Sequence, residues 1–186
     1  NFQAAPVSYL PAVLLLPAVF WAINFGIKRG LTATREVETT VPANLPWREV
    51  RIPTANGKQL FGWFIPAQPD APVLLVMHGW GANASLMLSS AAPLSDAGFA
   101  VLLVDARCHG ASGDESYTSL PRFADDIEAA LDCLADMPQV DATRLGVIGH
   151  SVGAGAALLS ATRRSDIRAV ISISAFAHPY EGMRRF

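Results

Sequence analysis

Four short apolar runs, divided by segments with helical spacing, constrain the fold of this chain more than any other feature. The runs cover residues 72–79, 99–106, 144–151 and 167–175 and show almost no alternation of apolar and polar residues. Such runs are typical of parallel strands that are covered on both faces. Helices are expected at about 84–97, 120–136 and 152–164. Strand, helix and strand in succession predict right-handed crossovers, and therefore an α/β fold with a mostly parallel sheet and helices on both faces.

A different pattern precedes these runs. Residues 47–66 form two alternating segments on either side of Asn56-Gly57, a dipeptide that favours tight turns. The pattern predicts an antiparallel β-hairpin at the start of the domain, which is expected to extend over residues 47–186.

The N-terminal part of the chain is apolar. No charged residue occurs from Pro6 to Ile27, and about 20 apolar residues are enough for a helix to cross a bilayer. We therefore expect a single transmembrane anchor within residues 1–27 and a polar linker over 28–46. The basic residues that follow the run place the domain in the cytoplasm by the positive-inside tendency; they are Lys28, Arg29 and Arg35. The alternative is a cleaved signal peptide, whose apolar region is usually about 7–15 residues long after a basic start.

Charge and cysteine content exclude several function classes. The chain of 186 residues has a formal net charge of −2, which argues against a nucleic-acid partner. Its two cysteines, Cys108 and Cys133, provide neither a disulfide framework nor the paired spacing of a metal site. No motif indicates a redox or metal enzyme, so we expect no metal and no cofactor.

A serine flanked by glycines is the strongest chemical signal. The sequence GHSVG places Ser151 between Gly149 and Gly153, at the point where an apolar run ends and a helical segment begins. This strand, turn and helix context turns a G-x-S-x-G match into a nucleophile elbow. Glycines are expected there because the serine backbone is strained and flanking side chains would collide with the neighbouring strand and helix. The helix N-terminus also favours developing negative charge at Ser151.

A second motif follows the first apolar run. The stretch MHGWGAN, residues 77–83, allows the chain to turn so that a backbone N–H faces the serine. An oxyanion hole needs two such donors, and we assign them to the N–H groups of Val152 and of Trp80 or a residue next to Trp80. We expect His78 to brace this loop rather than to act as the base.

A third stretch, DARCHGASG at residues 105–113, follows the second run. Together with GHSVGAG and HGWGAN it resembles the α/β-hydrolase superfamily, especially membrane-anchored members related to serine aminopeptidases and prolyl-oligopeptidase-like esterases. The resemblance extends from Trp47 to the end of the chain. The family usually has glycine where this chain has Cys108, a departure that lies in a loop. The resemblance implies a serine hydrolase whose acid and histidine follow the serine on later loops.

The general base is not evident from the sequence. His150 adjoins the serine and should point elsewhere, and His109 lies in a loop where the resemblance implies a structural role. His178 and Glu181 follow the last apolar run and are weaker candidates. We therefore expect the acid and the histidine to lie beyond Phe186, with the last strands of the fold.

These observations lead to one function and one alternative. The predicted function is hydrolysis of an ester, thioester or amide in a small acyl substrate, through an acyl-enzyme on Ser151. The alternative is a hydrolase-like protein without catalytic activity that serves as a binding or scaffold protein at the membrane.

Overall fold

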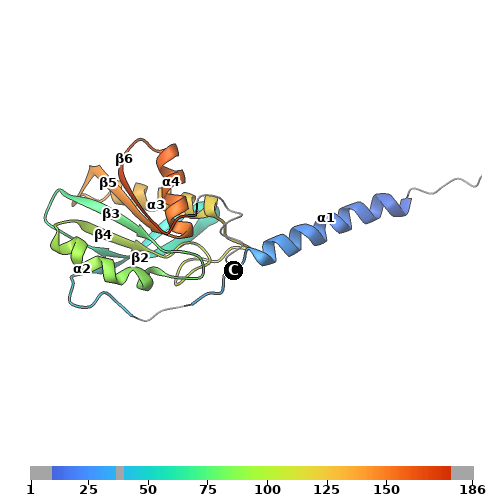
Figure 1. The fold of residues 1–186 in the computed structure, drawn as a ribbon, viewed down its shortest axis with the longest axis horizontal. Coiled ribbons are helices and arrows are strands. Elements are labelled where there is room, and N and C mark those ends of the chain that lie inside the picture. The colour runs from blue at the N-terminus through green and yellow to red at the C-terminus, as the bar shows by residue number, and fades with distance from the viewer. Residues whose placement is uncertain (1–9, 37–39, 177–186) are drawn as a thin grey trace, which may run out of the picture.

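The structure is a computed structural model that describes residues 10–36 and 40–176, with side chains from residue 15 onward. Figure 1 shows a sheet with helices packed on it and one long helix that stands apart. Two short 3-10 helices occur at Ala55–Gly57 and Ala84–Met87. The helices are α1 (Leu10–Gly30), α2 (Leu88–Asp96), α3 (Leu120–Ala135) and α4 (Val152–Arg163). The strands are β1 (Arg48–Thr54), β2 (Lys58–Ile65), β3 (Ala71–Met77), β4 (Ala100–Val104), β5 (Val140–His150) and β6 (Ile167–Ile173).

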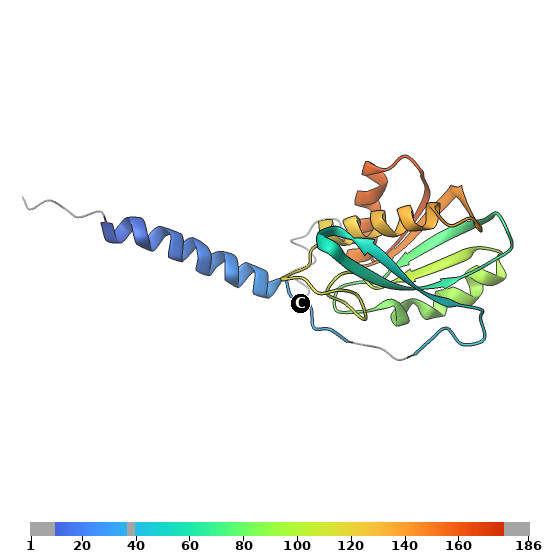
Figure 2. The ribbon, with the colours of Figure 1, turned by 180° about the vertical axis from the view of Figure 1, so that it is seen from behind.

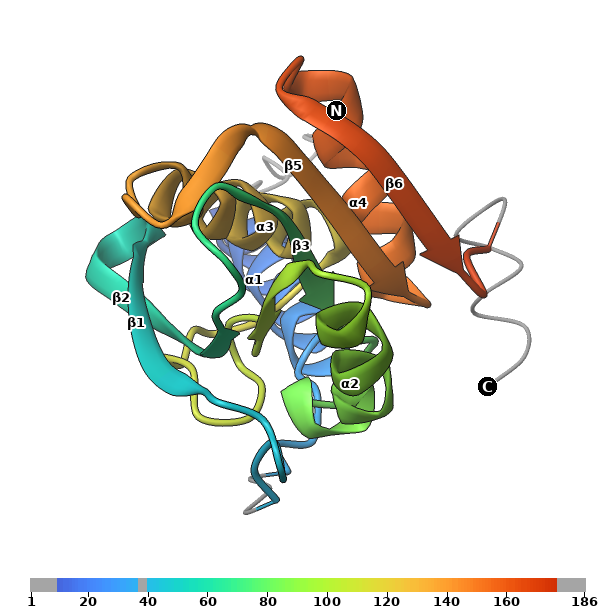
Figure 3. The ribbon, with the colours of Figure 1, turned by 90° about the vertical axis from the view of Figure 1, so that its left-hand side faces the viewer.

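These six strands form one sheet in the order β1-β2-β4-β3-β5-β6. The four strands from the apolar runs are parallel, since β3 pairs with β4 and β5, and β5 pairs with β6. The first two strands pair antiparallel, as the predicted hairpin requires, and β2 joins the rest through β4. Figure 3 shows the hairpin at one edge of the sheet and β6 at the other. The predicted α/β fold with a mostly parallel sheet is confirmed.

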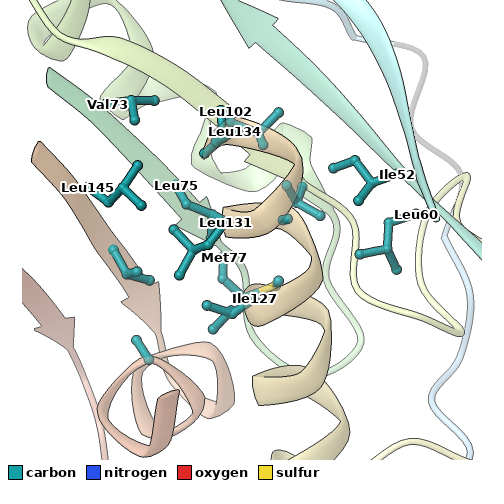
Figure 4. Packing of buried hydrophobic residues seen from close by; sticks show 14 of the residues in the cluster. Ile52, Leu60, Val73, Leu75, Met77, Leu102, Ile127, Leu131, Leu134 and Leu145 are labelled. Carbon is teal, nitrogen blue, oxygen red and sulfur yellow. The ribbon is translucent and has the colours of Figure 1, made fainter. Parts of the chain in front are cut away.

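Helices cover both faces of the sheet, with α3 and α4 on one face and α2 on the other (Figure 1). Alternate residues of β3 therefore enter different cores. Leu75 packs with Ile127 and Leu131 of α3 in the larger core (Figure 4), whereas Leu74 and Val76 pack with Ala91 of α2. Burial on both faces explains why these strands lack alternation in the sequence.

The parallel strands bring three loops to one edge of the sheet. The carboxyl ends of β3, β4 and β5 lie side by side, because Met77 is level with Val104 of β4 and with Gly149 of β5. Residues 78–83, residues 105–118 and Ser151 follow these three ends. This edge is called the carboxyl edge below. In open α/β sheets it is the usual position of a ligand site.

The structure corrects the N-terminal prediction. The helix α1 continues to Gly30, so that Lys28 and Arg29 form its last turn instead of starting the linker. Within the part of the chain that is described, no helix combines the length and the apolar character that a bilayer crossing requires. The predicted transmembrane helix over Pro6 to Ile27 is therefore not supported, and the first residues of that run lie outside the described ranges.

At the other edge of the sheet, β6 pairs with β5 alone among the described residues. Two of its large apolar side chains, those of Ile171 and Ile173, are exposed. Within the described part of the chain, β6 is therefore an uncovered edge strand.

Candidate active site

Ser151 is the single residue between β5 and α4. Its backbone has φ 54° and ψ −116°, a combination that L-residues rarely adopt. Three hydrogen bonds hold it there. The Ser151 N–H donates to the Ile173 carbonyl of β6 at 2.9 Å, and the Ser151 carbonyl accepts from the N–H groups of Ala154 and Gly155 at 3.0 and 3.2 Å. A strained residue fixed by two strands and a helix is typical of a functional site.

The glycines on either side of the serine make this geometry possible. A Cβ added to Gly149 would lie 2.3 Å from the Gly153 carbonyl oxygen, and one added to Gly153 would lie 2.3 Å from the His78 carbonyl oxygen. Both neighbours are backbone atoms, which cannot rotate away. Only glycine therefore allows α4 to pack this closely on β5 and on the end of β3.

The turn after β3 lies against Ser151. A Cβ added to Gly79 would be 3.0 Å from the Ser151 Cβ, so the Gly79 main chain lies close to the Ser151 side chain. Trp80 follows in this turn, and Val152 begins α4. Among the described residues, no acceptor is placed for the N–H of Trp80 or of Val152. Both assigned oxyanion donors are thus at the carboxyl edge, where no other described residue accepts from them, and their role stays a prediction.

Two buried histidines brace the loops of this edge. The His78 ring donates from Nδ1 to the Gly79 carbonyl and accepts at Nε2 from the Ala106 N–H, at 2.7 and 3.0 Å. Burial, with a contribution from the nearby His109, lowers the pKa of His78 to about 3.

The His109 ring bridges two loops. It donates from Nδ1 to the Arg107 carbonyl at 2.9 Å and accepts at Nε2 from the Gly81 N–H at 3.1 Å. Burial also lowers the pKa of His109. Because both nitrogens of His78 and both of His109 are used by the main chain, each ring is a neutral brace, in agreement with the expected structural roles.

No described residue acts as a base for Ser151. The Ser151 hydroxyl makes no hydrogen bond within the described part of the chain, and the buried Nδ1 of His150 has no partner there. His178 and Glu181 lie outside the described residues. No group of three metal-binding side chains is found in the described ranges.

Sequence reasoning missed the buried carboxylate that joins two of these loops. The Asp105 carboxylate, directly after β4, accepts from the N–H groups of Ala84 and Ala111 at 2.6 and 2.7 Å. Burial raises the pKa of Asp105, and these two N–H groups oppose that shift. The signal in the sequence is a single acidic residue directly after an apolar run, within the motif DARCHGASG.

Sequence reasoning also missed a buried ion pair beneath the loop at 105–118. The fully buried Arg107 donates from Nε to the Asp126 carboxylate of α3 at 2.6 Å. Asp126 also accepts from the Arg107 N–H and from the Thr54 hydroxyl. Burial raises the pKa of Asp126 to about 6, although Arg107 favours its charged form. The pair fixes the loop to α3 and to the hairpin.

Cys108 lies in the same loop, with φ 65°, in the left-handed region that favours glycine. This conformation explains why the resemblance leads one to expect glycine here. The buried Sγ contacts the backbone of Glu115 and Tyr117, and burial raises the pKa of the thiol. The hydrogen bonds of the thiol therefore lie within its own loop.

An open cleft of about 370 Å³ adjoins the turn after β3. Its lining includes two exposed apolar side chains, those of Trp80 and Leu86, which are 38% and 57% exposed. The complete lining is Glu36, Trp80, Gly81, Ala82, Asn83, Ser85 and Leu86. Because Trp80 follows Gly79, the cleft begins one residue from the contact with Ser151.

Comparisons with known proteins agree with this geometry. Residues 67–186 match the family model described as serine aminopeptidase, S33. The chain is 30% identical over 133 residues to a polyketide transferase of Aspergillus fumigatus, covering 70% of this chain and 46% of the relative. It is 28% identical over 142 residues to a thiohydrolase of Eupenicillium brefeldianum, covering 75% of this chain and 45% of the relative.

The fold is similar to that of an esterase from Pyrococcus furiosus. The TM-score is 0.75 at 25% identity, over 83% of this chain and 61% of the esterase. The chain spans about half the length of the curated relatives it matches.

Proposed function

The chain belongs to the serine aminopeptidase S33 family of α/β hydrolases, and on this basis we propose that it is a serine hydrolase that cleaves an acyl ester or thioester. Ser151 is the nucleophile of this proposal. The observation that carries it is the strained backbone of Ser151, held between β5 and α4 where both neighbouring glycines are sterically required. A packing site alone does not need a serine in this conformation.

The proposed chemistry follows from the positions of the groups. The Ser151 oxygen attacks the acyl carbonyl carbon, and a base from outside the described residues takes the hydroxyl proton. The N–H groups of Trp80 and Val152 donate to the resulting oxyanion, and loss of one such donor typically costs about 10²–10³-fold in rate. The alkoxide or thiolate then leaves, and water hydrolyses the acyl-enzyme on Ser151. No step needs a cofactor.

The substrate class rests on the cleft and on the relatives. The cleft beside the turn after β3 exposes the side chains of Trp80 and Leu86, and we propose that the acyl group bound at Ser151 extends along them. A thiohydrolase and a polyketide transferase are among the relatives, and an esterase is a structural neighbour. These similarities favour esters and thioesters over amides, which the family description leaves open.

A lipid surface is the proposed location, with the hydrolase domain on the cytoplasmic side. Figure 2 shows α1 standing out from the domain. The large apolar side chains described on α1 are 46–71% exposed, and Lys28 and Arg29 in its last turn suit anionic headgroups. These apolar residues are Leu15, Leu16, Val19, Phe20, Trp21, Ile23, Phe25 and Ile27. The test is flotation with vesicles that contain anionic lipid, in which deletion of residues 1–30 should abolish binding. Equal binding of both forms would exclude α1 as the attachment.

A scaffold protein without catalytic activity is the second candidate, since the Ser151 hydroxyl has no base among the described residues. The two functions differ in turnover. The natural protein should hydrolyse p-nitrophenyl acyl esters or acyl thioesters, and Ser151→Ala should lose at least about 10³-fold in kcat. Ser90→Ala in α2 is the matched control and should retain wild-type activity. A correctly folded natural protein without turnover on either substrate would favour the scaffold.

A further inference from the structure

We infer that residues 31–36, which follow α1, are a working part of the catalytic machinery: they position the oxyanion loop, residues 79–83, with Arg35 as the principal positioning residue. This inference rests on the proposed function, because it concerns the same oxyanion site.

The first observation is that this segment is bound to the carboxyl edge along its whole length. The Thr118 N–H donates to the Leu31 carbonyl at 3.0 Å, and the Ala33 side chain is buried. The Asn83 side-chain amide donates to the Glu36 carbonyl at 3.0 Å. In Figure 2 the end of α1 meets the domain beside the loop that follows β4. A linker that served only as a tether would not need these contacts.

The second observation is the position of the Arg35 guanidinium. Nη1 donates to the Gly110 carbonyl at 3.1 Å, and Nη2 donates to the Ser112 carbonyl and the Asp114 carboxylate at 2.8 and 2.6 Å. The Ser112 carbonyl belongs to a residue that is almost fully buried. A planar guanidinium that spans two carbonyls of one turn fixes the shape of that turn.

The third observation connects that turn to the oxyanion loop. His109 precedes Gly110, and its Nε2 accepts from the Gly81 N–H at 3.1 Å. A displacement of the turn held by Arg35 would therefore displace Gly81 and its neighbour Trp80, the assigned oxyanion donor.

The opposite end of the oxyanion loop is held by the same segment. Asn83 donates to the Glu36 carbonyl, and its side-chain oxygen accepts from the Ser85 N–H, which caps the short helix that follows. The oxyanion loop is therefore held at Gly81 by His109 and at Asn83 by the Glu36 carbonyl. Both contacts depend on residues 31–36. The end of α1 is joined to these residues because the Leu31 N–H donates to the Ile27 carbonyl.

The electrostatics support this arrangement. Burial raises the pKa of the Asp105 carboxyl, and the Arg35 charge is one of the groups that oppose this rise. The Asp105 carboxylate accepts from the Ala84 N–H beside the oxyanion loop. Loss of the guanidinium would weaken the charged form of Asp105 and loosen that contact as well.

The experiment compares two arginines in the natural protein. Arg35→Ala removes a guanidinium that binds carbonyls at the carboxyl edge. Arg168→Ala removes the same charge and a similar bond, from Nε to the Thr143 carbonyl, near the start of β6. We expect Arg35→Ala to lower kcat on a p-nitrophenyl ester by about 10-fold, and at most about 10²-fold, with little change in KM, as small misplacement of a catalytic group does. Arg168→Ala should retain wild-type kcat, and Arg35→Lys should recover part of the loss.

Hydrogen exchange provides a readout independent of turnover. The Gly81 amide should exchange faster in Arg35→Ala and at the wild-type rate in Arg168→Ala. If Arg35→Ala does not fold, Asn83→Asp takes its place, since aspartate keeps the helix cap and loses the donor to the Glu36 carbonyl; the same fall in kcat is expected. Wild-type kcat in the folded Arg35→Ala protein, or in Asn83→Asp when it takes that place, would overturn the inference. An inactive wild-type protein would instead count against the proposed function.

Discussion

Gly153→Ala tests how tightly the first turn of α4 is packed against the end of β3. The added Cβ would lie 2.3 Å from the His78 carbonyl oxygen and 2.7 Å from the Met77 carbonyl oxygen. An ordinary contact needs at least 3.4 Å, so the helix and the strand must separate by about 1 Å. Neither oxygen can rotate away, because both belong to the main chain.

The magnitude follows from two opposing effects. Overpacking of a close-packed site typically costs about 1–3 kcal/mol, and two fixed contacts place this site at the upper end. Alanine in a helix is about 1 kcal/mol more favourable than glycine, which offsets part of that cost. We expect the free energy of unfolding to fall by about 2 kcal/mol.

Gly155→Ala, in the same helix, is the matched control. Its added Cβ would lie 2.8 Å from Leu120 Cδ1, the end of a side chain that can change rotamer. The gain in helix propensity should therefore prevail, and stability should stay equal to the wild type or rise by up to about 1 kcal/mol.

Urea unfolding of the three proteins measures the difference, with the midpoint shifting and the slope unchanged. Labelling of the folded proteins by a fluorophosphonate should also be slower for Gly153→Ala, because Val152 and Ser151 move with the helix. Equal stability of Gly153→Ala and Gly155→Ala would contradict the close approach of α4 to β3.

Three further predictions concern the buried groups of the carboxyl edge. Burial lowers the pKa of His78 from 6.5 to about 3, so its contribution to stability is complete above pH 6.5 and falls as the pH drops toward 3. The His78 contribution should fall by about 2 kcal/mol at pH 5, and the raised pKa of Asp126, about 6, offsets part of this because its protonation favours the folded state below pH 6. Urea titrations should therefore show a smaller net loss at pH 5, and a midpoint that rises toward pH 5 would contradict this. Asp126→Ala leaves a buried guanidinium without its nearest carboxylate and should lower the free energy of unfolding by about 3–5 kcal/mol. Asp125→Ala, at a half-exposed position, should lower it by under about 1 kcal/mol. Equal urea midpoints for the two variants would refute this difference. In a Cys133→Ser background, the Cys108 thiol should react with a disulfide reagent only as fast as the protein unfolds, and rapid reaction of the native protein would show that it is accessible.

The sheet could be predicted because burial on both faces leaves a clear pattern. Leu74, Leu75 and Val76 are consecutive and apolar because neighbouring residues enter different cores. The turn at Asn56 and Gly57 was equally clear, since both residues have positive φ values of 58° and 67°. The strand order was not predictable: β4 lies between β2 and β3, and the pattern of a strand does not identify its neighbour.

The elbow could be predicted because only glycine fits at the two positions that flank its serine, and glycine is visible in the sequence. A side chain at Gly149 or Gly153 would clash with backbone atoms, and Ser151 is the single residue between β5 and α4. The residues that hold the loops around the elbow have no such signature in the sequence. Arg35 resembles any basic residue in a polar linker until the fold brings the Gly110 and Ser112 carbonyls to it.

The N-terminal prediction shows the limit of composition. The position of Lys28 and Arg29 inside α1 depends on where the helix ends, which hydropathy does not define.

The nucleophile assignment is tested most directly by mapping a covalent adduct. The natural protein should be treated with a fluorophosphonate, digested and analysed by mass spectrometry, beside Ser151→Ala and Ser90→Ala. Our account predicts one phosphonylated peptide in the wild type and in Ser90→Ala, modified at Ser151, and none in the folded Ser151→Ala protein. An adduct on another residue, or equal labelling of Ser151→Ala, would contradict the assignment of Ser151 as the nucleophile.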